Sequence, residues 1–303
     1  GSAVNSGSMT FSNGIIDIGG PSANTVNSVA IRSNLIGSLT VNSSNNTQVS
    51  GTALATISGT NTGLTSFTLN LNNADSSVFI DTSVAALGAA GSTVKLTKGI
   101  LVLNASSALS YNAWNTEFAG GVLRNRGNNT GTAATYNGNG TLTANSAIAS
   151  LTTNNLTYAG TMDLGNTGKT LTVAPGLGGF IDFTNTISNT GNLTINSNAA
   201  GAGTGTVRLS AANTFSGTAT TTQNLGTLAL NHVDALQNAT LDTGASGTQS
   251  VTFTAAGTTY NGSAARTVDY STVGAPSTSG TGATGTWGIS ISGNAATATS
   301  ATS

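Results

Sequence analysis

The chain has 303 residues but no cysteine, only 3 prolines and a single histidine. Without cysteine it forms no disulfide and no thiolate metal site, and one histidine excludes a His-rich metal cluster. No run of about 20 apolar residues is present, so no membrane-spanning helix is predicted. The first ten residues, GSAVNSGSMT, lack a basic segment followed by an apolar one and do not predict a signal peptide.

Charge is also scarce. The 8 basic and 9 acidic residues make up 6% of the chain and give a formal net charge of -1. Nucleic acids and anionic membranes are bound by clustered Lys and Arg, so we expect neither nucleic-acid binding nor membrane insertion. Average domains carry about 25% charged residues, which makes an ordinary soluble enzyme a poor fit. Because 37% of the residues are hydrophobic and the net charge is close to zero, we expect the chain to fold.

Gly, Ser, Thr and Asn together provide roughly half of the residues. Apolar residues alternate with polar ones in short groups, for example at Phe67, Leu69 and Leu71. Such alternation, bounded by Gly and Asn, is typical of short half-buried strands. Helical spacing is not sustained anywhere, and the stretch SVAALGAAG from Ser83 predicts a turn because glycine interrupts it. The sequence therefore predicts an all-β protein.

A glycine followed by a short alternating strand recurs along the chain, often at intervals close to twenty residues. It is found at Gly99, Gly121, Gly140, Gly160, Gly168, Gly191, Gly205 and Gly226. Equivalent strands of successive coils satisfy their backbone groups by stacking about 4.8 Å apart, which predicts an elongated parallel β-helix or β-solenoid over residues 1–250. Like charges aligned at that spacing would repel, which accounts for their scarcity. Three intertwined chains would have a similar composition, and the periodicity does not separate the two arrangements.

Residues 205–242 carry the most regular copy of this repeat. The residues that follow its pattern are Leu209, Ser210, Asn213, Thr214, Phe215, Ser216, Gly217, Thr218, Gly226, Thr227, Leu228, Leu230, Ala235, Leu236 and Leu241. The segment resembles the autotransporter-associated β-strand repeat. The resemblance implies a coil of a right-handed parallel β-helix, with a role in elongation and display and not in catalysis.

The character of the sequence changes in residues 251–303. The residues that carry a second resemblance include Tyr260, Asn261, Gly262, Trp287, Ile289, Ile291 and Asn294. They resemble the collar modules of phage tail fibres, which implies a small trimeric β collar and a homotrimeric virion appendage. The further strand that usually follows in such modules is missing, so we expect the chain to be part of a longer fibre.

Charged side chains offer two candidate groups. Asp163 and Asp182 lie about one coil apart, and a glycan-cleaving tailspike would need two carboxylates about 5–9 Å apart. The acidic residues are scattered, however, and Glu117 is the only glutamate, so we expect no catalytic residues. Arg124 and Arg126 share one face of a strand and are expected to contact Glu117 or a partner chain.

The remaining candidates favour structural roles. The sequence positions no acid or nucleophile that could act with His232 in catalysis, so His232 is expected in a solvated turn. Trp114, Tyr111 and Phe118 could form a cluster on which a sugar stacks, but we favour the alternative that they pack in the core. The run PGLGGF at Pro175 lacks the lysine of a phosphate-binding loop and predicts a turn. No repeat of the calcium-binding type is found, so no metal and no cofactor is expected.

Three classes of function follow. The favoured one is the shaft of a virion appendage, a stiff spacer that acts with other tail or fibre proteins and reaches a host glycan or protein through a tip outside this chain. The passenger of a secreted bacterial autotransporter adhesin, at the cell surface, is the alternative. A threonine array that binds ice or glycan is the third, suggested by groups such as Thr141 and Thr143, but these groups look sporadic.

Overall fold

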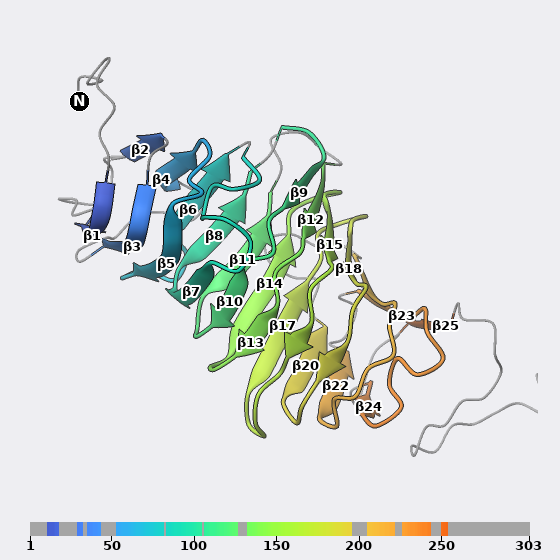
Figure 1. Cartoon of the computed structure of the whole chain (residues 1–303). Coiled ribbons are helices and arrows are strands. Elements are labelled where there is room, and N and C mark those ends of the chain that lie inside the picture. Colours follow the sequence, from blue (N-terminus) through green and yellow to red (C-terminus); the bar gives the residue numbers. More distant parts are fainter. Residues whose placement is uncertain are drawn as a thin grey trace, which may run out of the picture. The chain divides into compact units, whose positions relative to one another are not determined.

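In the computed structural model, the described part of the chain is a β-solenoid of stacked coils (Figure 1). The described residues are 11–17, 29–32, 35–43, 53–81, 83–104, 106–126, 132–195, 205–221, 226–243 and 250–253. They contain 25 strands and no helix. The prediction of an all-β parallel solenoid is confirmed.

The strands form three parallel sheets, here called A, B and C, one on each side of the coil. Sheet A has 8 strands, in the order β1 (Phe11–Asp17), β3 (Leu35–Ser43), β5 (Leu64–Leu71), β7 (Thr93–Lys98), β10 (Asn115–Phe118), β13 (Gly140–Leu142), β16 (Met162–Asp163) and β19 (Ile187–Ser188). Sheet B has 10 strands, in the order β2 (Val29–Arg32), β4 (Ala53–Ser58), β6 (Ser77–Asp81), β8 (Ile100–Leu103), β11 (Val122–Asn125), β14 (Ser146–Ser150), β17 (Thr170–Ala174), β20 (Asn192–Ile195), β22 (Thr218–Thr221) and β24 (Thr240–Asp242). Sheet C has 7 strands, in the order β9 (Leu109–Tyr111), β12 (Ala133–Tyr136), β15 (Asn155–Tyr158), β18 (Phe180–Phe183), β21 (Thr206–Leu209), β23 (Thr227–Leu230) and β25 (Ser250–Phe253).

Each complete coil crosses sheets A, B and C in turn, as β10, β11 and β12 do. The coil length follows from the register, because paired residues occupy equivalent positions in successive coils. Phe67 pairs with Val94 on sheet A, and Val207 pairs with Leu228 on sheet C, so the coil is longer at the first position than at the second. The coil at the second position is close to the twenty residues that the glycine spacing predicts, whereas the coil at the first position is longer, because the corners between sheets vary in length.

Inward-facing side chains from all three sheets form one continuous hydrophobic core, while the alternate residues of each strand face outward. The burial of β15 and β18 alternates strictly along each strand. Small residues are required where corners stack closely. A Cβ on Gly160 would lie 2.0 Å from the carbonyl oxygen of Gly138, one coil away. This contact explains the glycine before β16, whereas Gly168, before β17, has room for a Cβ but a backbone φ of +90° that favours glycine.

Part of the core is a column of aromatic rings that runs from coil to coil. Tyr111, Trp114, Tyr136, Tyr158 and Phe183 follow one another with ring centroids 5.5–5.9 Å apart. All five are 0–1% exposed. The indole N–H of Trp114 donates to the carbonyl oxygen of Gly88 at 3.0 Å. These contacts confirm core packing for the aromatic group that the sequence singles out; Phe118 is also fully buried.

The three tyrosines of this column, Tyr111, Tyr136 and Tyr158, are completely buried. Burial raises the pKa of Tyr158, and the nearby Tyr136 raises it further. Burial also raises the pKa of Tyr136, although its hydrogen bond with Thr116 opposes the shift. Among the described residues, the Tyr158 hydroxyl has no hydrogen-bond partner. A tyrosinate at either position would lack solvation, so the core holds both tyrosines in the neutral form.

We expect the Tyr158→Phe variant to be as stable as the wild type at neutral pH, because no hydrogen bond is lost. A raised pKa in the folded state means that stability is complete below the unfolded tyrosine pKa of about 10 and falls as pH rises above it. The variant should therefore lose stability less steeply above that pH, as measured by chemical unfolding at several pH values. Tyr136→Phe, which loses the bond with Thr116, is the control and should be less stable already at neutral pH. An unchanged alkaline profile for Tyr158→Phe would contradict the assignment.

Candidate functional sites

The repeat motif of residues 205–242 places one buried asparagine at the centre of three coils. Asn213 is 1% exposed. Its Oδ1 accepts from the backbone N–H of Ile187 at 2.8 Å, in the preceding coil, and its Nδ2 donates to the carbonyl oxygen of Ala235 at 3.0 Å, in the following one. Phe215, two residues later, is buried in the core. The motif residues thus connect coils.

A second asparagine makes the same pair of contacts far from that motif. Asn61 accepts from the backbone N–H of Leu35 at 3.1 Å and donates to the carbonyl oxygen of Ala86 at 2.9 Å. It is also 1% exposed. Because a buried backbone group without a partner is costly, these carboxamides replace backbone pairing at the corners where β3 and β19 begin. We call Asn61 and Asn213 the axial asparagines.

The two carboxylates considered for glycan cleavage are not stacked. Asp163 lies in β16 of sheet A, whereas Asp182 lies in β18 of sheet C, within the same coil. Asp163 Oδ1 accepts from the backbone N–H of Gly165 at 2.7 Å and from Asn189 Nδ2 at 2.9 Å. Asp182 Oδ1 accepts from the Ser210 hydroxyl at 2.6 Å. The expected separation of one coil is wrong because the coils at these positions are longer than the spacing between the two aspartates, so each falls on a different sheet.

The expected contact between the arginine pair and Glu117 is also wrong. Glu117 Oε1 lies 2.9 Å from Lys95 Nζ, in the neighbouring coil of sheet A, and accepts from the Thr143 hydroxyl at 3.0 Å. Arg124 is on sheet B, where burial lowers its pKa and Asp75 partly offsets the shift. Alternation along the strand predicted that the two arginines share a face, but it did not predict that they lie on a different sheet from Glu117.

Arg126 lies beside a small apolar cluster on the outer side of sheet B. Its guanidinium carbon is 5.1 Å from the centre of the Phe79 ring. Phe79 packs there with Ile100 and Val102, and the three side chains are 2–8% exposed; the half-buried Val122 packs against them. A second cation–π contact, at 3.8 Å, joins Arg208 to Phe180 on sheet C. The described arginines with ring contacts therefore serve packing between coils.

His232 lies in the turn after β23, as predicted. Its Nδ1 accepts from the backbone N–H of Asp234 at 3.0 Å, and its side chain is 39% exposed. The glycine run at Pro175 is also a turn, between β17 and β18. Both predicted turns are confirmed by these positions.

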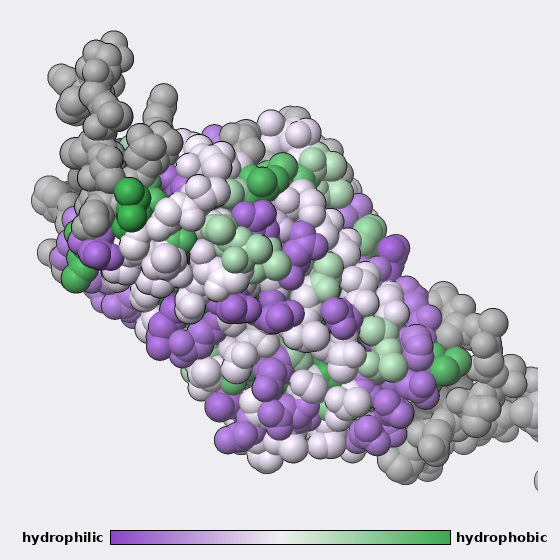
Figure 2. Space-filling model, in the orientation of Figure 1, coloured by the Kyte–Doolittle hydropathy of each residue, from purple (hydrophilic) through white to green (hydrophobic). Residues whose placement is uncertain are grey.

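Threonine side chains are less sporadic than the sequence suggests. Thr172 pairs with Thr194, and Thr194 with Thr220, so the outer side of sheet B carries a threonine column over three coils. Thr141 faces outward on sheet A and belongs to a different column, next to Glu117 and Asp163. Figure 2 shows a largely pale surface on the face in view, with hydrophilic and hydrophobic residues interspersed. The coil register creates this column, which is hidden in the linear sequence.

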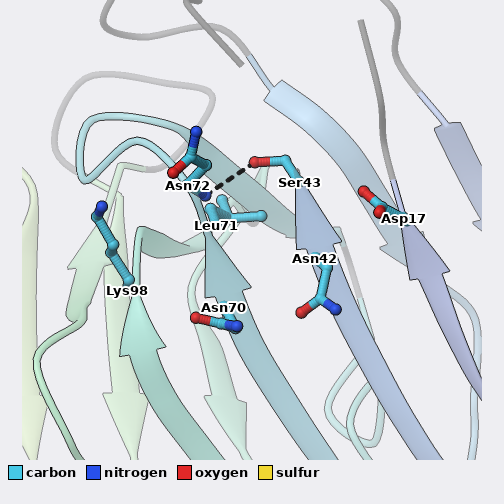
Figure 3. Close-up of a pocket in the computed structure, with 7 residues that line it drawn as sticks. All are labelled: Asp17, Asn42, Ser43, Asn70, Leu71, Asn72 and Lys98. Carbon is cyan, nitrogen blue, oxygen red and sulfur yellow. Dashed lines mark hydrogen bonds between the residues drawn. The ribbon is translucent and has the colours of Figure 1, made fainter. Parts of the chain in front are cut away.

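A groove opens where β1, β3, β5 and β7 end (Figure 3). Its lining residues are Asp17, Asn42, Ser43, Asn70, Leu71, Asn72 and Lys98, and its volume is about 320 Å³. Sequence reasoning missed this group. The signal was present in the similar strand ends TVN (40–42) and TLN (68–70), but only the register of sheet A, which pairs Asn42 with Asn70, shows that these asparagines are neighbours.

The collar motif residues Tyr260, Asn261, Gly262, Trp287, Ile289, Ile291 and Asn294 lie outside the described residues. In the described ranges, no three His, Asp or Glu side chains gather in a group that could hold a metal ion. Within the same ranges, no helix is long and apolar enough to cross a membrane. The candidate sites of the described chain are therefore the axial asparagines, the threonine column and the groove.

Comparison with known proteins gives no relative: no family model, no curated protein and no solved structure matches the chain.

Replacement of Asn213 by Ala should lower the free energy of unfolding by about 2–4 kcal/mol, because two buried backbone groups lose their partner. Chemical unfolding followed by circular dichroism measures the change. The matched control is Asn185→Ala: Asn185 is exposed, although its Nδ2 donates to the carbonyl oxygen of Ala159 at 3.2 Å. Its loss should cost less than about 1 kcal/mol. Equal effects at the two positions would contradict the special role of the axial asparagine.

Proposed function

We propose that the chain is the shaft of a virion appendage of the phage tail fibre type and acts as a stiff, non-catalytic spacer for host attachment. The observation that carries the proposal is the uninterrupted parallel pairing from the first described strand of each sheet to the last. Nine intervals between the 10 strands of sheet B, at about 4.8 Å each, give about 43 Å of continuous stack. The resemblance of residues 251–303 to a collar module supplies the link to a virion.

Rigidity is the property that a spacer needs, and the coils provide it in three ways. Backbone hydrogen bonds join each coil to the next, the core is continuous along the stack, and the axial asparagines join neighbouring coils where strands begin. Each coil contacts only its neighbours, so length is gained by adding coils without changing the design. A solenoid of this kind places an attachment tip at a distance from the particle.

In this proposal the collar holds three chains in register, in contact with other tail or fibre proteins. The host glycan or protein is reached through a tip outside this chain. The end strands of the described stack belong to open sheets, and open edges invite edge-to-edge association.

The passenger of a bacterial autotransporter adhesin is the second candidate. The observation in its favour is that the segment resembling the autotransporter-associated repeat forms coils within the solenoid, from β21 to β24. A passenger functions as a single chain at the cell surface, whereas the fibre shaft functions as a trimer. The oligomeric state of the full chain therefore separates the two proposals.

Light scattering coupled to size-exclusion chromatography should give a mass about three times the 29.6 kDa of one chain. Deletion of residues 254–303, which leaves β25 paired with β23, should yield monomers or aggregates. A milder change, Ile291→Asp in the full chain, should weaken the trimer because it places a charge in the collar motif; Ser300→Asp, outside the motif residues, is the control. A monomeric full chain would favour the passenger, and a stable trimer of the shortened chain would contradict the role of the collar.

A further inference from the structure

We propose that the groove at the ends of β1, β3, β5 and β7 binds a small, uncharged, polyhydroxylated compound, the size of one or two sugar rings (Figure 3). The groove is open to solvent, and its volume of about 320 Å³ lies at the lower end of the range for small-molecule sites. The proposal stands on the residues of the groove and does not depend on the shaft function.

The register of sheet A, with an irregularity between Leu69 and Asn70, builds a row of polar side chains along the groove. Asp17 pairs with Asn42, Asn42 with Asn70, and Asn70 with Lys98. Neighbouring positions are about 4.8 Å apart, as in any parallel sheet. The row therefore presents a carboxylate, two carboxamides and an ammonium group in sequence. A carboxamide both donates and accepts hydrogen bonds, which is what hydroxyl groups require.

Three members of the row have no partner among the described residues. Within that part of the chain, the side chains of Asn42, Asn70 and Lys98 make no hydrogen bond and no ion pair, and Asn42 Oδ1 is a buried acceptor left unsatisfied. The axial asparagines, in contrast, are bonded to the coils on both sides. Because Asn70 and Lys98 are exposed, their side chains can turn toward a ligand and give it access to Asn42.

The floor of the groove is more rigid than this row. Ser43 is 3% exposed, and its Oγ accepts from the backbone N–H of Asn72 at 3.0 Å. Leu71 is fully buried and provides the apolar part of the lining. A rigid floor beneath mobile polar side chains suits a small ligand that is bound through hydrogen bonds to its hydroxyl groups.

The charges of the lining select against ions. The lining residues include one carboxylate, Asp17, and one ammonium group, Lys98, so their charges cancel. A calcium or magnesium ion would need several oxygen ligands without a neighbouring cation, and a phosphate would need more than one cationic or fork-like donor. No aromatic ring is among the described lining residues, so the face of a sugar has no stacking partner there and the contacts are made through hydroxyl groups.

The test uses the full chain and three uncharged probes: methyl glucoside, methyl N-acetylglucosaminide and inositol. Binding is followed by ligand-observed saturation-transfer NMR and by the shifts of the side-chain amide resonances of Asn42 and Asn70. We expect saturable binding of at least one probe in the millimolar range, with shifts at both amides. Each of Asn70→Ala and Lys98→Ala should weaken it about fivefold or more, since each removes a hydrogen bond. Thr141→Ala, an exposed position elsewhere on sheet A, is the matched control and should leave binding unchanged.

Circular dichroism and thermal unfolding establish that the variants fold; both changed side chains are exposed, so we expect wild-type stability. Two results would overturn the proposal: no saturable binding of any probe at tens of millimolar, or binding that persists unchanged when Asn70→Ala and Lys98→Ala are combined. Preference for a methyl glycoside over inositol would identify a sugar as the ligand, and equal binding of the three would support a general polyol site.

Discussion

Parallel backbone pairing between successive coils is the interaction on which the rest of the structure depends. A short strand leaves its N–H and C=O groups unpaired, and in this chain the next coil supplies their partners. Because the register is maintained, each side chain also lies beside the equivalent side chain of the neighbouring coil. The core, the polar columns and the groove are all consequences of this alignment.

The alignment restricts which side chains the sequence can use. Charged residues that meet in register in the described sheets have opposite sign, as Lys95 and Glu117 do on sheet A and Asp182 and Arg208 do on sheet C. Uncharged polar residues carry no such restriction and form continuous columns. Low charge and an abundance of Thr, Ser and Asn therefore follow from the stacking and require no special function. Glycine is needed where corners approach closely, as Gly160 does against Gly138.

The sequence predicted the architecture because the relevant signals are local. Alternation identified the strands, and glycine punctuation identified the corners. The core role of Trp114 and the turn around His232 also followed from local context. The sites were harder to predict because they depend on register. Asp163 and Asp182 were expected to lie about one coil apart, and the longer coils at these positions put them on different sheets.

The axial asparagines and the groove also depend on register, which is why the sequence alone did not reveal them. Asn213 belongs to a repeat motif that the sequence displays, yet its two partners lie 26 and 22 residues away in different coils. Asn42 and Asn70 become neighbours only through a strand pairing that is irregular at Gly37. Local patterns contain no information about such offsets, because they depend on how each corner is built.

Disulfide trapping tests the central claim most directly, since the chain has no cysteine to interfere. Thr172 and Thr194 are paired on adjacent coils of sheet B, and the strand spacing of about 4.8 Å lies within the Cα separation that a disulfide allows. The T172C/T194C variant should form an intramolecular disulfide under mild oxidation, detected by mass spectrometry. The T172C/T220C variant, two coils apart, should not. Efficient trapping of the second pair, or none of the first, would contradict the stacked register.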